Sequence, residues 1–180
     1  MNTMKNYLLG LAIASMAIVS ACTSKADKEI ATATLNETAD NTKTIGTAKF
    51  YQQSDGKVKL ELNIDFPSKA DSTVAVHLHE HGDCGDMGMN THGHWNPTKE
   101  NHGKWGSSAY HSGDIGNIQL DGKGKGSVTV ATDRWNITSG DSNSIVGRGI
   151  IVHGGTDDYT TQPTGNSGPR VGCGIIEIVK

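Results

Sequence analysis

The 180-residue sequence predicts an all-β fold of antiparallel strands, arranged as a sandwich or a barrel. Residues 58–66 alternate apolar and polar side chains without a break, which is typical of a strand buried on one face. Glycine is abundant, with 23 residues, and turns rich in glycine separate further short apolar runs. Outside an N-terminal apolar run, no segment sustains the 3.6-residue period of a helix. We therefore expect many short strands joined by turns.

The predicted strands follow one another at short intervals along the chain. Besides residues 58–66, apolar runs indicate strands at 46–51, 74–79, 115–120, 127–131, 145–153 and 174–179. Turns are expected at 54–56, 121–126 and 139–141, where glycine joins Asp, Ser or Lys. Two longer stretches, 80–110 and 154–170, interrupt this pattern. Loops of this length inside a compact domain are usually functional.

The N-terminus indicates a leader followed by a linker. Lys5 precedes an apolar run, Tyr7 to Ile18, that is too short to cross a bilayer as a helix. The run ends in Val-Ser-Ala-Cys, which resembles a bacterial lipobox with Cys22 as the lipidated residue; an ordinary cleaved signal with an incidental cysteine is the alternative. Residues 22–45 have little apolar content and are interpreted as a flexible tether. The expected organisation is therefore a lipoprotein signal peptide (1–21), a tether (22–45) and one domain (46–180).

This reading places the protein in the periplasm or cell envelope, held at the membrane by its lipid. Two cysteines then remain, Cys84 and Cys173. Because such a compartment is oxidising, a disulfide between them is favoured. Two buried thiols, or soft metal ligands, are the alternatives, although neither cysteine has the CxxC spacing of a thiolate site. The formal net charge of −3 argues against nucleic acid as the main partner.

All eight histidines lie between residues 77 and 153, which indicates metal binding. His77 and His79 are two residues apart on a predicted strand, so both side chains leave the same face. His153 ends another apolar strand and could bring a third imidazole to them.

A second group lies in the glycine-rich loop. His94, His102, His111 and Asp114 could complete a tetrahedral zinc shell. A shell without an open position is structural, which speaks against a zinc hydrolase.

Five separated motifs in this chain resemble those of the copper–zinc superoxide dismutases. They are His-Leu-His-Glu-His-Gly-Asp-Cys (77–84), Gly-His-Trp-Asn-Pro (93–97), His-Ser-Gly-Asp-Ile-Gly-Asn (111–117), Gly-Arg-Gly-Ile-Ile-Val-His (147–153) and the glycine-rich segment 165–176. The resemblance covers roughly residues 45–180. It implies an antiparallel Greek-key β-sandwich or flattened barrel, immunoglobulin-like, with two long functional loops.

The resemblance also implies a role for each residue. Copper would be bound by His77, His79, His94 and His153, and zinc by His94, His102, His111 and Asp114, with one ion of each metal per subunit and His94 bridging them. Asp157 would join a copper histidine to a zinc histidine, and Cys84 and Cys173 would form the intrasubunit disulfide. Arg170 would attract superoxide, although a salt bridge that pins a loop is an alternative role for it.

The implied activity is dismutation of superoxide to dioxygen and hydrogen peroxide, which protects against extracytoplasmic superoxide. A metal-buffering or metal-delivering surface protein and a zinc-only module are alternatives, but the full set of ligands and Arg170 favours the enzyme. The implied partners are superoxide, the membrane through the lipid, and a second copy of the chain in a homodimer. His81 and His92 are additional to the family pattern, and we expect them to be exposed and not to bind either metal.

Overall fold

The computed structural model describes residues 26–180, so the predicted signal peptide and Cys22 lie outside the described residues. The elements, in chain order, are β1 (Lys28–Glu37), β2 (Thr44–Gln52), β3 (Val58–Asp65), η1 (Pro67–Lys69), β4 (Thr73–His79), η2 (Asp86–Thr91), β5 (Asp114–Gln119), β6 (Lys125–Thr132), β7 (Gly149–His153), β8 (Arg170–Ile175) and β9 (Glu177–Ile178). Between residues 26 and 180 no helix has the length and apolar character needed to cross a membrane.

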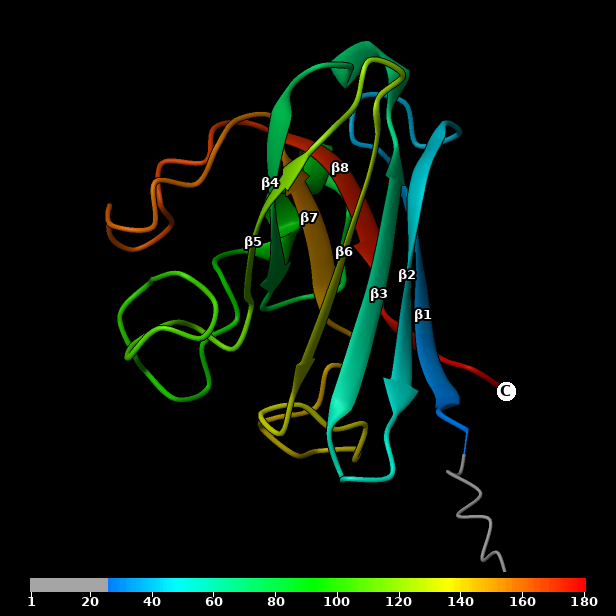
Figure 1. Ribbon diagram of the computed structural model, residues 1–180, viewed down its shortest axis with the longest axis vertical. Helices are drawn as coiled ribbons and strands as arrows, with labels where there is room; N and C mark the ends of the chain where they lie inside the picture. Colours follow the sequence, from blue (N-terminus) through cyan, green and yellow to red (C-terminus); the bar gives the residue numbers. More distant parts are fainter. Residues whose placement is uncertain (1–25) are drawn as a thin grey trace, which may run out of the picture.

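The strands form one antiparallel sheet in the order β5-β4-β7-β8-β1-β2-β3-β6, with β9 paired to β1. The two ends of this path, β5 and β6, approach each other, so the sheet curls into a nearly closed barrel (Figure 1). β3 and β4 follow one another in the chain but lie in different halves of the barrel. The predicted all-β antiparallel fold is confirmed.

The core is built from alternating side chains on the inner face of the sheet. In β3, Val58, Leu60, Leu62 and Ile64 are buried, as the unbroken alternation predicted. Strand β4 differs because it is buried along nearly its whole length. Val74, Val76 and Leu78 enter the core, whereas the side chains of the other face, among them His77 and His79, lie beneath the two long loops. Those loops, residues 80–113 and 154–169, occupy the stretches where functional loops were predicted.

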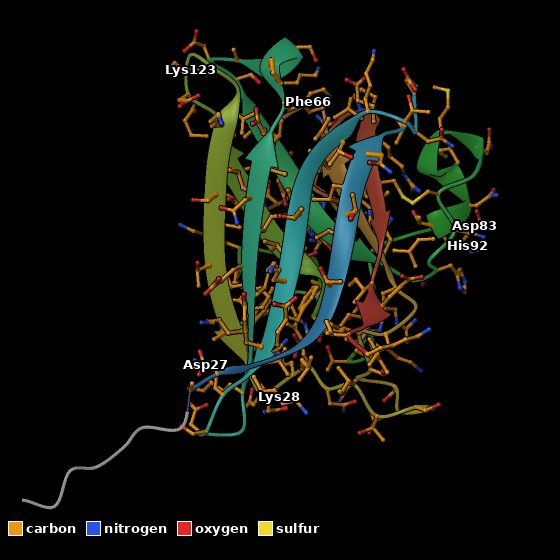
Figure 2. All side chains as sticks on the ribbon, turned by 90° about the vertical axis from the view of Figure 1, so that its right-hand side faces the viewer. Asp27, Lys28, Phe66, Asp83, His92 and Lys123 are labelled. Atoms are coloured by element: carbon orange, nitrogen blue, oxygen red, sulfur yellow. A yellow bond between two sulfur atoms is a disulfide. The ribbon has the colours of Figure 1, made fainter. Side chains whose placement is uncertain are left out.

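The prediction of a flexible tether over residues 22–45 is wrong from Lys28 onward. Residues 28–37 form β1, which pairs with β2 along most of its length, and β2 itself begins at Thr44 rather than at residue 46. Ala31, Ala33 and Leu35 are buried, whereas Thr34 between them is exposed. The period of two is present in the sequence, but alanine offers so little apolar surface that the pattern resembles a polar linker. The domain therefore starts near Lys28 (Figure 2).

Two other strand predictions need new limits. The strand expected over 145–153 starts only at Gly149, because residues 145–148 form a turn in which Gly147 has a φ of 76°. The strand expected over 174–179 is replaced by β8, which begins at Arg170, and the short β9.

The predicted disulfide between Cys84 and Cys173 is confirmed, with the two Cα atoms 5.8 Å apart. It fastens the long loop after β4 to β8, close to the η2 segment (Figure 2).

Candidate metal centre

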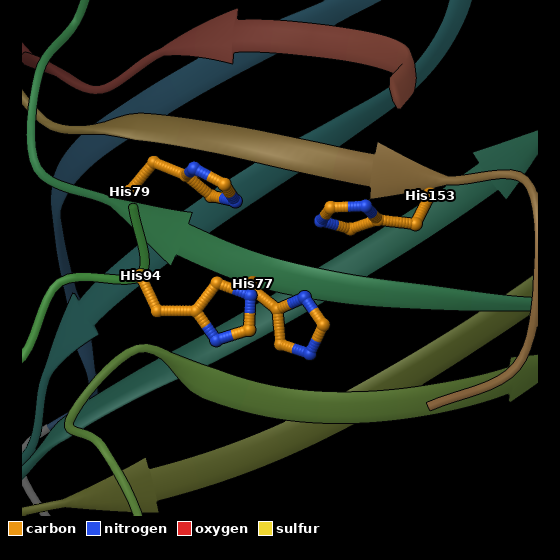
Figure 3. Close-up of side chains that lie close together, drawn as sticks. All are labelled: His77, His79, His94 and His153. Carbon is orange, nitrogen blue, oxygen red and sulfur yellow. The ribbon is translucent and has the colours of Figure 1, made fainter. Parts of the chain in front are cut away.

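Four histidines from three parts of the fold meet on the outer face of β4. His77 and His79 leave this face of β4, and His153 ends β7 directly opposite Ala75 in the antiparallel register. Because cross-strand partners share a face, His153 lies on the same side as the two β4 histidines. One ring nitrogen of each of these histidines, and one of His94, lie within 4.8 Å of one another. Figure 3 shows the four rings turned toward a common centre.

His94 reaches this centre from the long loop because its neighbours are fixed on the barrel. Trp95 is buried in the core and its N–H donates to the carbonyl of Leu78, at 2.8 Å. His94 itself forms an isolated antiparallel bridge with His79. The loop thus runs briefly beside the end of β4 like an added strand, with Trp95 turned inward and His94 turned toward the other histidines.

In three of these histidines, one ring nitrogen is engaged outside the centre. His77 Nε2 lies 2.9 Å from Asp157 Oδ2, His79 Nδ1 lies 2.8 Å from the His92 carbonyl, and His153 Nδ1 lies 3.2 Å from the Gly168 carbonyl. The nitrogens that remain are buried and have no hydrogen-bond partner: His77 Nδ1, His79 Nε2, His94 Nε2 and His153 Nε2. Buried polar atoms without partners are rare and costly. Four unpaired ring nitrogens that converge on one point are suited to binding a metal ion.

Burial keeps these imidazoles in the form that a metal requires. Loss of solvation lowers the pKa of His77 to about 3 and that of His153 to about 4. The same cause lowers the pKa of His79 and of His94. Neutral imidazole is the species that binds metal, so protons compete weakly for this set.

The second donor set consists of His94, His102, His111 and Asp114, all buried and with donor atoms within 4.8 Å. Asp114 Oδ1 lies 2.9 Å from His94 Nδ1, and Oδ2 lies 3.0 Å from His102 Nδ1. His111 Nδ1 lies 3.3 Å from Asp114 Oδ1. The Nδ1 atoms of His102 and His111 are close to the carboxylate but form no hydrogen bond with it. Three Nδ1 atoms and one carboxylate thus face the same point, which fits a tetrahedral zinc site.

The charges of this second set depend on Asp114 and on the neighbouring Asp157. Despite burial, which acts in the opposite direction, the imidazoles of His102, His111 and His94 beside the carboxylate hold the pKa of Asp114 far below its usual value. Burial likewise opposes ionisation of His102, but the adjacent Asp114 carboxylate and the hydrogen bond of Nε2 with Asp157 raise its pKa to about 9. Asp114 is therefore ionised and supplies one negative charge for a cation, whereas zinc binding requires His102 to release its proton.

Asp157 connects the two donor sets, at the place that the family resemblance implied. Its Oδ2 lies 2.9 Å from His77 Nε2, and its Oδ1 lies 2.9 Å from His102 Nε2. Asn117 fixes the main chain of Asp157 with two hydrogen bonds, of 2.8 and 2.9 Å. Such partners orient ligating imidazoles and set which nitrogen faces the metal.

Arg170 pins the loop, but it does so through neutral oxygens rather than a carboxylate. Its Nη1 donates to the Gly88 carbonyl and to Thr91 Oγ1, and its Nη2 donates to the His92 carbonyl at 2.6 Å. That carbonyl also contacts His79 Nδ1. The His92 carbonyl oxygen therefore lies between the Arg170 guanidinium and the His79 imidazole.

Sequence reasoning missed two side chains that support the site. Asn117 holds Asp157, and Gln162 clamps the main chain of His102 through its amide oxygen (2.8 Å) and nitrogen (3.0 Å). Asn117 lies in β5 and Gln162 in the second long loop, and a lone amide side chain does not indicate its hydrogen-bond partner in the sequence, so neither role could be found without the fold. His81 and His92 are exposed and belong to neither set, as expected.

An antiparallel β-barrel that gathers two buried donor sets around one shared histidine is a two-metal protein of the copper–zinc type. The comparisons with known proteins agree. Residues 44–176 match the family model described as copper/zinc superoxide dismutase. Superoxide dismutase [Cu-Zn] 1 of Aquifex aeolicus is 36% identical over 138 residues, which cover 74% of this chain and 80% of the relative. Superoxide dismutase [Cu-Zn] of Yarrowia lipolytica is 36% identical over 143 residues, which cover 76% and 91%.

Solved structures resemble the fold as well. A superoxide-dismutase-like protein from Bacillus subtilis matches with a TM-score of 0.69 at 25% identity, over 80% of this chain and 96% of that chain. The clock protein EA4 matches with a TM-score of 0.72 at 31% identity, over 83% and 94%. The chain belongs to the copper/zinc superoxide dismutase family.

Proposed function

We propose that this protein is a superoxide dismutase whose first donor set binds copper and whose second binds zinc. The ligands are His77, His79, His94 and His153 for copper, and His94, His102, His111 and Asp114 for zinc. The observation that carries the proposal is the position of His94. Its Nε2 faces the first set while its Nδ1 faces Asp114 in the second. One imidazole thus serves both sites.

A copper ion held by the first donor set would supply one-electron redox chemistry, and a zinc ion held by the second would supply a fixed positive charge. The residues of the chain prepare this reaction. Four protein donors leave the zinc site closed, so its role is structural. His94 Nδ1 is held in that site, so Nε2, which faces the first donor set, is the atom that can hold a proton whenever it does not bind copper and pass it to the reduced substrate. Asp157 keeps His77 and His102 oriented.

Arg170 supplies the attraction for the anionic substrate. A guanidinium stays charged at physiological pH, and this one is fixed beside His79 by its hydrogen bonds to the loop. The positive charge and the first donor set therefore lie on the same side of the barrel.

The test is the decay of pulse-generated superoxide in the presence of protein that holds one copper and one zinc per chain. We expect catalytic decay for the wild type and none for His153→Ala, with circular dichroism showing that the variant is folded. A fully loaded wild-type protein that leaves the decay rate unchanged would disprove the proposal.

We further propose that the protein acts in the periplasm or cell envelope, anchored to the membrane by a lipid on Cys22, and protects against extracytoplasmic superoxide there. The leader pattern and the disulfide, which suits an oxidising compartment, support this proposal. Cys22→Ser should move the protein from the membrane fraction to the soluble fraction. Unchanged fractionation would contradict the anchor. The homodimer stays a prediction, which light scattering of the purified protein tests.

A further inference from the structure

A third group of potential metal ligands lies on the surface, outside both donor sets. Glu80, His81 and His92 are all exposed, and one ligand atom from each lies within 4.8 Å of the others. The rings of His81 and His92 are 4.6 Å apart between centroids and nearly perpendicular. Glu80 Oε2 lies 4.0 Å from His92 Nδ1. Figure 2 shows His92 at the outer edge of the molecule, beside the η2 segment.

The main chain holds these three residues opposite one another. The N–H of His81 donates to the Thr91 carbonyl at 3.1 Å, and the N–H of Glu80 donates to the Gly93 carbonyl at 3.1 Å. Arg148 donates to the carbonyl of Glu80 at 2.8 Å. Two short segments are thus paired across the end of β4. A metal ion would have to order only side chains, which lowers the entropic cost of binding.

His92 has a main-chain conformation that side-chain-bearing residues rarely adopt, with φ 61° and ψ −140°. Positive φ of this kind is strained for a residue with a side chain and tends to occur at functional sites. In His92 this conformation directs the carbonyl and the side chain to opposite sides. The carbonyl of His92 points inward to His79 Nδ1 and Arg170 Nη2, while its ring lies outside against His81.

We propose that Glu80, His81 and His92 form a third, exchangeable metal site that captures a divalent transition-metal ion at the surface. Two imidazoles and one carboxylate are donors suited to Zn²⁺ and Cu²⁺, and Cu²⁺ binds such sites more tightly. Three protein ligands leave a coordination position to water, so the ion can exchange. His92 connects this surface site to the first donor set, because its ring belongs to the surface site and its carbonyl contacts His79 Nδ1 and Arg170 Nη2.

The proposal does not depend on dismutase activity, so its test is a binding measurement. Protein already holding one copper and one zinc per chain, verified by metal analysis, is titrated with ZnCl₂ in a calorimeter. We expect one further equivalent of zinc to bind to the wild type. The single variants His81→Ala and Glu80→Gln should each weaken this binding at least tenfold. His92→Gly should do the same while keeping the positive φ without strain.

The matched control is Glu177→Gln, which removes an exposed carboxylate from β9 and should leave the third equivalent unchanged. Histidine ring signals in the nuclear magnetic resonance spectrum of the ascorbate-reduced, diamagnetic protein give a second measurement. Zinc should shift the rings of His81 and His92 and leave the six buried histidines in place. The proposal is overturned if the loaded protein takes up no third equivalent, or if His81→Ala and His92→Gly bind it as tightly as the wild type.

Discussion

At the scale of single residues, the nitrogen that each histidine offers is decided by the partner of its other nitrogen. His77 leaves Nδ1 free because Asp157 engages Nε2, whereas His79 and His153 leave Nε2 free because main-chain carbonyls engage Nδ1. The HxH spacing and the strand end are local features, so the sequence predicted that His77, His79 and His153 come together, whereas the family resemblance added His94 to them. The sequence could not predict the nitrogens, since their partners at positions 92, 157 and 168 are distant along the chain.

Adding a single methyl group at Gly165 should disturb both donor sets. It has a φ of 66°, and a Cβ there would collide with Asp157 Oδ1 and His102 Nε2. Gly165→Ala should therefore displace Asp157 and weaken zinc binding roughly 10–100-fold, the usual effect of losing a partner of a ligating histidine. Competition with a chromogenic chelator measures this loss.

Gly140→Ala is the matched control, because Gly140 also has a positive φ, 79°, but a Cβ there would meet nothing within 4 Å. It should cost about 1–2 kcal/mol in stability from backbone strain, with zinc affinity unchanged. Equal zinc affinities in the two variants would show that the contact with Asp157 is not what requires glycine at 165.

At the scale of elements, the loop after β4 is shaped by its attachments rather than by its own secondary structure. Trp95 fixes it to the core, Arg170 holds residues 88–92, and Cys84 ties its start to β8. The sequence identified the long loop and its cysteine, because glycine-rich punctuation and cysteine number are visible there. The hydrogen bonds from Arg170 to main-chain oxygens were not predictable, since any loop residue offers a carbonyl.

Removing the disulfide should loosen this loop and destabilise the whole domain. The bond joins residues 89 positions apart, so reducing the entropy of the unfolded chain stabilises the fold by roughly 2–4 kcal/mol. The double variant Cys84→Ser, Cys173→Ser avoids a free thiol and should shift the urea midpoint down accordingly. Hydrogen exchange should increase first over residues 84–92. An unchanged midpoint would mean that Arg170 and Trp95 suffice to hold the loop.

The strands show why some elements were visible in the sequence and β1 was not. β3 alternates Val and Leu with Lys and Glu, so its two faces differ strongly. β1 alternates Ala with Thr, residues that differ little in hydropathy, and its pairing partners lie in β2, β8 and β9. Its position in the sheet depends on long-range pairing, and a local pattern this weak cannot reveal it.

At the scale of the whole molecule, β1 is what joins the two halves of the barrel. Strands β4 and β7, which carry histidines of the first donor set, are followed in the sheet by β8. In the strand order, β1 lies between β8 and the pair β2 and β3. Strand β1 therefore connects the half of the barrel that carries the two donor sets to the half that supplies much of the core. A segment that looks like a linker is a structural requirement for the metal centre.

This requirement can be tested with two substitutions on neighbouring residues of β1. Leu35 is fully buried, so Leu35→Ala should lower the free energy of unfolding by about 2–5 kcal/mol. Thr34 is exposed, so Thr34→Ala should change it by less than about 1 kcal/mol. If residues 28–37 were a tether, both changes would have no effect.

Truncation tests the same requirement independently. Protein that starts at Asp27 keeps β1 and should unfold at the wild-type urea midpoint. Protein that starts at Thr38 loses the strand between β8 and β2, so it should fail to fold or to retain copper and zinc. A folded, metal-retaining protein that starts at Thr38 would refute the structural role of β1.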